Sequence, residues 1–104
     1  NFQLNIPVNR KTPQARYHEI DSKITCRKIR ANRYQLEVIC ASRSNLLGLI
    51  VKEINLLEMS IHNAKINTLG QRAEDFFIIS SKIKLNLESR IQTLIKNIKS
   101  KVDE

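Results

Sequence analysis

The chain has 104 residues, a hydrophobic content of 41% and a net charge of +8. This length is enough for one domain with a real core and is too short for two. No apolar run approaches the ~20 residues that a membrane helix needs, which excludes a helical membrane protein. Because the sequence starts at Asn1 and shows no signal-peptide pattern, we expect it to be a piece of a longer protein.

The positive charge is concentrated in the first part of the chain. Residues 1–43 hold nine Lys and Arg against three acids, a net +6, whereas the remaining 61 residues hold nine against seven, a net +2. Such an excess indicates either a surface for nucleic acid or another acidic partner, or a solvated linker. No base-stacking aromatic residues are interleaved with the charges, which favours the linker. We therefore interpret residues 1–20, which also carry both prolines, as a basic linker from a preceding domain, and residues 21–104 as the domain itself.

Cys26 and Cys40 are the only cysteines, and their spacing matches no metal-binding pattern. Both lie in strand-like segments, which favours buried free thiols over a disulfide. Free thiols indicate a reducing compartment, so we expect the protein to be cytoplasmic.

Two strands are predicted first. Residues 22–29 alternate apolar and basic side chains, as an edge strand does when Lys and Arg discourage unwanted pairing. Residues 30–33 form a short polar turn, and residues 34–41 alternate cleanly as a second strand.

A helix is predicted next, after the break at residues 42–45. Ser44 or Asn45 can cap its first turn, and Gly48 indicates close packing on a sheet. The apolar residues that follow at helical spacing are Leu46, Leu47, Ile50, Ile54 and Leu57.

A hairpin and a second helix complete the chain. Residues 59–68 and 73–80 are the predicted strands of the hairpin, with Gly70 in its turn because glycine adopts a positive φ readily. Asn86 is expected to cap the second helix. Its apolar stripe, with a period near 3.6, is Leu87, Ile91, Leu94, Ile95, Ile98 and Val102.

The order of these elements predicts the fold class. Without the first strand, the order is β-α-β-β-α, which is the split βαβ unit of ferredoxin-like folds lacking its last strand. A short hairpin places residues 22–29 in that empty position. We predict an α+β, ferredoxin-like fold: a four-stranded antiparallel sheet, completed by an N-terminal edge strand, with both helices on one face.

The returning strand of the hairpin carries four consecutive apolar residues, from Phe76 to Ile79. We expect Phe76 and Ile78 to point away from the helices. An exposed apolar stripe usually marks an interface, so we predict that a second copy or a neighbouring domain covers them. The residues expected to face the helices are Ala73, Asp75, Phe77 and Ile79.

A family resemblance is carried by the stretch SIHNAKINTLGQRAEDFFI, residues 60–78. It resembles the pattern Leu-His-Gly-Ala-Arg-Ile-x-Thr-Leu/Ile-Gly-Glu-Arg-Val-Glu-Asp-x-Phe of ACT domains, and most closely the C-terminal ACT domains of bifunctional PII uridylyltransferase/uridylyl-removing enzymes. The resemblance covers roughly residues 14–100. The residues that match are His62, Ala64, Ile66, Thr68, Gly70, Arg72, Glu74, Asp75 and Phe77.

The resemblance implies an amino-acid site in the seam between two ACT units, with glutamine as the ligand. A helix N-terminus suits the ligand carboxylate. Where the family has Asp-Arg-Pro-Gly-Leu-Leu, this chain has residues 42–47, and Asn45 carries a side chain at the position of the family's Gly. The candidate ligand-binding residues are Arg43, Ser44, Asn45, Leu46 and Leu47 on the loop, and Ile61, His62, Asn63 and Lys65 on the facing strand.

The resemblance also implies a regulatory role. Glutamine would favour removal of uridylyl groups over their transfer to the PII signal protein. The catalytic domains of the parent enzyme, and the Mg²⁺ that they use, would lie outside this chain.

We expect no catalysis, and no cofactor, in this chain. His18 and His62 are the only histidines, and neither pairs with a Cys or a carboxylate at catalytic spacing. Glu74 and Asp75 are adjacent on a strand, so they point to opposite faces. Two other readings stay open. One is a basic ferredoxin-like domain that binds nucleic acid. The other is an ACT assembly module without a ligand, which the departure at residues 42–45 favours.

Overall fold

The computed structural model describes residues 21–104, so the predicted linker at residues 1–20 lies outside the described residues. Within the described part of the chain, the predicted order of elements is confirmed, and each strand agrees with its prediction to within one residue at either end. The elements are β1 (Lys23–Arg30), β2 (Arg33–Ala41), α2 (Leu46–Leu56), β3 (Met59–Leu69), β4 (Arg72–Ser81) and α3 (Leu87–Val102).

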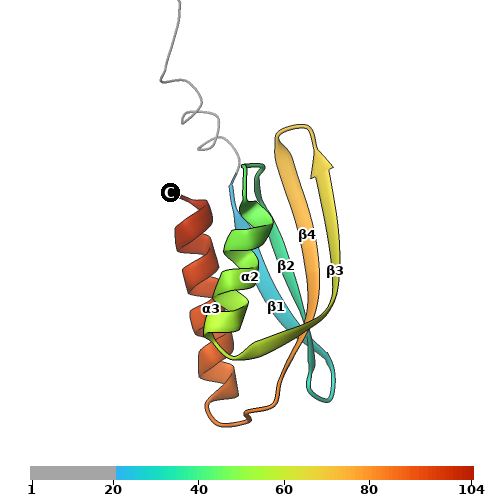
Figure 1. The fold of residues 1–104 in the computed structure, drawn as a ribbon, viewed down its shortest axis with the longest axis vertical. Helices are drawn as coiled ribbons and strands as arrows, with labels where there is room; N and C mark the ends of the chain where they lie inside the picture. Colours follow the sequence, from blue (N-terminus) through green and yellow to red (C-terminus); the bar gives the residue numbers. More distant parts are fainter. Residues whose placement is uncertain (1–20) are drawn as a thin grey trace, which may run out of the picture.

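The four strands form one antiparallel sheet in the order β1-β2-β4-β3, and both helices cover the same face of it (Figure 1). The predicted ferredoxin-like α+β fold is therefore confirmed, including the N-terminal edge strand β1 beside β2. The short β1–β2 hairpin forces this pairing, because a two-residue connection can join only adjacent antiparallel strands.

The core lies between the helices and the inner face of the sheet. On β4 the period-2 alternation of burial holds from Arg72 to Ile79: Ala73, Asp75, Phe77 and Ile79 are each at most 2% exposed, as predicted. Phe76 and Ile78 point to the opposite face and are only half-buried. From the helices, the buried apolar residues are Leu46, Ile50, Ile54, Ile91, Leu94, Ile98 and Val102.

The β3–β4 hairpin extends past the N-terminus of α2 (Figure 1). Both α2 and β3 have 11 residues, but at ~1.5 Å per helical residue and ~3.3 Å per strand residue the helix is roughly half as long as the strand. Ile66 faces the helix side, paired with the buried Asp75, and is still 45% exposed. The inner face of the sheet is thus open near the first turn of α2.

The predicted side-chain caps are wrong. Asn45 and Asn86 do occupy the N-terminal boundary positions of α2 and α3, but neither makes a side-chain cap hydrogen bond. Both adopt the left-handed conformation, with φ of 61° and 56°. A capping side chain normally goes with extended backbone at this position, which neither residue has.

Candidate ligand site

The loop between β2 and α2, residues 42–45, lies over the open part of the sheet. The Ser42 amide donates a hydrogen bond of 2.7 Å to the Gln71 carbonyl, which ties the loop to the turn of the β3–β4 hairpin. The first bond of α2 runs from the Leu49 amide to the Asn45 carbonyl, at 3.1 Å. The amides of residues 46–48 therefore have no acceptor within the helix.

Gly48 lies against the side chain of Asn45. A Cβ built on Gly48 would collide with the Oδ1 of Asn45 and would meet no atom of the sheet among its nearest neighbours. The predicted reason for this glycine, close packing on the sheet, is wrong. Glycine here instead gives the Asn45 side chain room to lie along the first turn of α2.

A solvent-open pocket of about 360 Å³ lies between this loop and the β3–β4 hairpin. Ligand pockets in proteins occupy ~300–1,000 Å³, so this one suits a small molecule. Its wall on the helix side comes from the loop and the first turn of α2, and its sheet side comes from β3 and β4. The lining residues are Ser42, Arg43, Asn45, Leu46, Leu47, Gly48, Ile66, Thr68, Ala73 and Asp75.

Asp75 is the charged residue of the sheet side of this pocket. It is 1% exposed, and its Oδ1 has no hydrogen-bond partner. Burial raises the pKa of the carboxyl above its usual range, and a backbone hydrogen bond at Asn67 acts in the opposite direction. Within residues 21–104 this Oδ1 is the one buried side-chain nitrogen or oxygen atom without a partner.

Arg43 lines the pocket and is also bound to the end of α3. Its Nη1 donates a hydrogen bond of 3.0 Å to the Lys101 carbonyl. A positive side chain near a helix C-terminus is favourable because the last carbonyls carry partial negative charge. The guanidinium is thus anchored beside the pocket.

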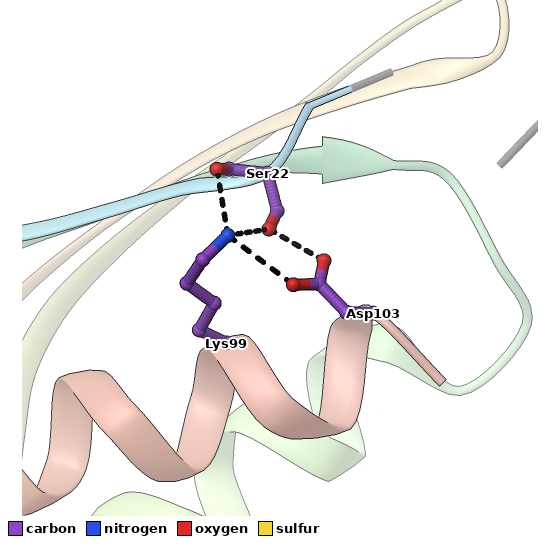
Figure 2. A network of polar contacts seen from close by, with 3 residues as sticks. All are labelled: Ser22, Lys99 and Asp103. Atoms are coloured by element: carbon purple, nitrogen blue, oxygen red, sulfur yellow. Dashed lines mark hydrogen bonds and ion pairs between the residues drawn. The ribbon is translucent and has the colours of Figure 1, made fainter. Parts of the chain in front are cut away.

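The end of α3 is bound in turn to the residue that precedes β1 (Figure 2). The Nζ of Lys99 lies 2.8 Å from the Ser22 Oγ and 3.2 Å from the Asp103 Oδ2. The Ser22 hydroxyl donates to the Asp103 Oδ1 at 2.6 Å. Because these groups are exposed, each pair contributes less than ~1 kcal/mol. They do place the entry of the chain into β1, the end of α3 and the pocket loop at one end of the molecule.

The structure brings together four of the nine predicted ligand-binding residues: Arg43, Asn45, Leu46 and Leu47 all line the pocket. Leu47 was also expected in the apolar stripe of the helix, but it is 46% exposed. In the first turn of α2 it meets the pocket and not the core. Ser44 belongs to the loop but does not line the pocket.

The four predicted strand residues lie away from this pocket within one chain. Ile61 packs partly against the core, and the Nε2 of His62 lies 2.6 Å from the Ser80 Oγ at a bulge in β3. Asn63 and Lys65 line a groove on the open face of the sheet. Because we expected this strand to face the loop of another unit, that arrangement stays a prediction.

The groove on the open face of the sheet has a volume of about 300 Å³ and contains both Phe76 and Ile78. The remaining lining residues are Gln35, Asn63, Ala64 and Lys65. Neither helix reaches this face, since both pack on the other one. The placement of Phe76 and Ile78 agrees with our expectation, and the partner that would cover them stays a prediction.

The two cysteines of the described residues are not activated as nucleophiles. Cys26 and Cys40 carry free thiols, as predicted, and burial raises the pKa of each to about 11, far from that of a nucleophile at neutral pH. Residues 21–104 contain no group of three or more His, Cys, Asp or Glu that could hold a metal ion. Neither α2 nor α3, the helices of this part of the chain, is long and apolar enough to cross a membrane.

Asp75 is the charged lining residue that the sequence analysis did not assign to the site; the uncharged ones that it did not assign are Ser42, Gly48, Ile66, Thr68 and Ala73. Its inward direction follows from the alternation of β4, and a carboxylate among inward-facing Ala73, Phe77 and Ile79 was the available signal. The fold and the pocket together define a ferredoxin-like α+β module with a site of small-molecule size.

The comparisons with known proteins point to one kind of enzyme. The chain is similar to several bifunctional uridylyltransferase/uridylyl-removing enzymes. The protein of Haemophilus influenzae (strain 86-028NP) is 31% identical over 64 residues, 62% of this chain and 7% of the relative. That of Nitrosospira multiformis is 39% identical over 59 residues, 57% of this chain and 7% of the relative. That of Ralstonia nicotianae is 29% identical over 92 residues, 88% of this chain and 11% of the relative.

The chain therefore spans only about a tenth of the length of these relatives, or less. No protein-family model matches it, and no solved structure matches it. The similarity is that of one domain-sized segment to a small part of a much larger enzyme.

Proposed function

We propose that residues 21–104 form a regulatory ACT domain of a uridylyltransferase/uridylyl-removing enzyme, and that this domain binds glutamine. In this role it controls whether the parent enzyme adds uridylyl groups to the PII signal protein or removes them. The domain is not itself catalytic.

The observation that carries this proposal is the pocket at the N-terminus of α2. The similarity of the chain to uridylyltransferase/uridylyl-removing enzymes supports the same proposal. The amides of residues 46–48 and the positive end of the helix dipole attract an anion such as a ligand carboxylate. No acidic residue lies in the first turn of α2 to oppose it. The apolar and hydroxyl side chains of Leu47, Ile66 and Thr68 line the rest of the pocket.

A ligand regulates a distant centre only if it binds one arrangement of the protein better than another. The pocket is connected to the end of α3 by its lining residue Arg43, which donates a hydrogen bond to the Lys101 carbonyl. The end of α3 contacts Ser22, where the chain enters β1. Occupancy of the pocket therefore acts at the end of the domain from which the preceding part of the chain departs.

The test is a titration of the purified chain with glutamine, glutamate, asparagine and alanine, followed by amide chemical shifts and by calorimetry. We expect glutamine to give saturable shifts that cluster at residues 42–48 and 66–75. If millimolar glutamine shifts none of these amides, the proposal is wrong for the isolated chain. Binding of short oligonucleotides at physiological salt would instead support the nucleic-acid reading.

The groove at Phe76 and Ile78 favours a second candidate, an assembly module. In that case the domain holds the parent enzyme together by packing its open sheet face on another ACT unit, and the pocket has no ligand. This reading predicts self-association of the chain without any response to amino acids, so the same titration, accompanied by sedimentation, separates the two.

A further inference from the structure

The pocket beside α2 contains groups of opposite charge. One wall has the uncapped amides at the N-terminus of α2, and the sheet side has Asp75. A single charged ligand would suit only one of them. The zwitterion of an α-amino acid, whose carboxylate and ammonium group are attached to the same carbon atom, suits both.

Asp75 has no cationic partner among the residues described here. The nearby Arg43 donates to the Lys101 carbonyl, and no ion pair joins it to Asp75. Buried carboxylates are normally paired or fully hydrogen-bonded because removing a charge from water is costly. Asp75 is a lining residue of the pocket and one of its carboxylate oxygens is buried without a partner, so a bound ligand can supply the donor that the described residues do not.

We propose that Asp75 is a specificity-determining residue of this pocket, and that its carboxylate binds the α-ammonium group of an amino acid whose carboxylate lies at the amides of residues 46–48. This inference rests on the proposed function and adds to it. The site thus recognises the α-ammonium group of the ligand as well as its carboxylate, and it uses residues of one chain only.

Buried donors and acceptors discriminate strongly, because a ligand that lacks the matching group leaves a protein group unpaired. The pocket should therefore reject 4-carbamoylbutanoate, which is glutamine without its amino group. It should equally reject 4-aminobutanamide, which is glutamine without its carboxylate. A pocket that used only the helix N-terminus would accept the first of these compounds.

The experiment compares the original chain with Asp75→Asn and with Glu74→Gln as a matched control. Asp75→Asn keeps the size of the side chain and removes its charge. Glu74 is the neighbouring acid on the opposite face of β4, where its Oε2 pairs with the Nε of Arg72 at 3.0 Å. Each protein is first checked for folding by circular dichroism, and then titrated with glutamine and both analogues.

We expect the original chain and Glu74→Gln to bind glutamine at least about tenfold more tightly than 4-carbamoylbutanoate, which corresponds to ~1.4 kcal/mol or more. Asp75→Asn should lose this preference and bind the two compounds about equally. If Asp75→Asn binds glutamine as tightly as the original chain does, the role of Asp75 is refuted and the proposed function stands. If the original chain responds to no amino acid, the proposed function fails, and the role of Asp75 fails with it.

Discussion

Replacing Asp75 by Asn should stabilise the folded domain at neutral pH in the absence of ligand. The carboxyl is 1% exposed and its Oδ1 has no partner. A buried polar group without a partner costs ~1–3 kcal/mol, and more when it is charged. Because Asn is also polar, part of this cost remains in the variant. We therefore expect a gain of about 1–2 kcal/mol in the free energy of unfolding at pH 7.

The gain should depend on pH. Burial raises the pKa of Asp75 in the folded state above its unfolded value of ~3.9. The folded state then binds the proton more readily than the unfolded state does. The stabilisation that comes from this tighter proton binding at Asp75 is fully present below about pH 4 and is lost as the pH rises through the pKa of the folded state. As the pH falls toward 4, protonation of the Asp75 carboxyl in the folded state reduces the charge difference between the two proteins, so their stabilities should converge.

Thermal unfolding at pH 4, 5, 6 and 7 measures this difference. For a domain of this size each kcal/mol shifts Tm by roughly 4–8 °C, so the effect is easily detected. The thiol of Cys40, which interacts with Asp75, does not affect the comparison, because its pKa is raised to about 11 and it does not titrate in this pH range. Glu74→Gln serves as the control. A Tm difference that is constant from pH 4 to pH 7, or an Asp75→Asn variant less stable than the original at pH 7, would refute the reasoning.

Three further predictions concern other parts of the molecule. Phe76→Lys should leave the fold intact and weaken self-association in sedimentation experiments. Phe77, one residue away, is 1% exposed, so Phe77→Ala should lower the free energy of unfolding in urea by ~3–5 kcal/mol. Loss of folding in Phe76→Lys would place Phe76 in the core. Gly48→Ala should displace the Asn45 side chain, so its effect on unfolding should differ between the original and an Asn45→Gly background, and strictly additive effects would contradict the contact. Cys26 and Cys40 should react with iodoacetamide at pH 8 about 100-fold more slowly in the folded chain than in urea. A pKa of about 11 against the usual 9.0 lowers the thiolate fraction by that factor. Equal reaction rates in the two conditions would show that the thiols are not shielded.

Much of the fold follows from the sequence because successive side chains of a strand point to opposite faces of the sheet. Ala73, Asp75, Phe77 and Ile79 could be assigned to the core from period 2 alone. The position of β1 could be inferred because the short turn predicted at residues 30–33 can join only adjacent antiparallel strands, which places β1 beside β2. Ile66 shows the limit of this approach. Its face was predictable, but its exposure depends on the length of α2 relative to the β3–β4 hairpin, which involves two elements at once.

The candidate site was only partly predictable for a related reason. Arg43, Asn45, Leu46 and Leu47 lie together on one loop, so their proximity is local and could be inferred from the chain. Asp75 joins them from a strand more than 25 positions away, across the sheet. A single inward carboxylate in a strand is also compatible with a structural pair in the core. Only the absence of a partner for its Oδ1, together with the pocket, distinguishes a binding group from a structural one.

The conformation of Asn45 decides how its departure from the family loop should be understood. Glycine at this position allows a positive φ, and the φ of Asn45 is 61°. Among residues with a side chain, Asn is one of those that adopt this conformation most readily. The backbone of the loop can therefore keep the path that a glycine would give it, and the amides of residues 46–48 stay uncapped. What changes is the space in front of them, because the Asn45 side chain lies over Gly48 and lines the pocket. The substitution narrows the site without closing it, so an affinity for glutamine weaker than that of Asn45→Gly is the outcome that this geometry favours.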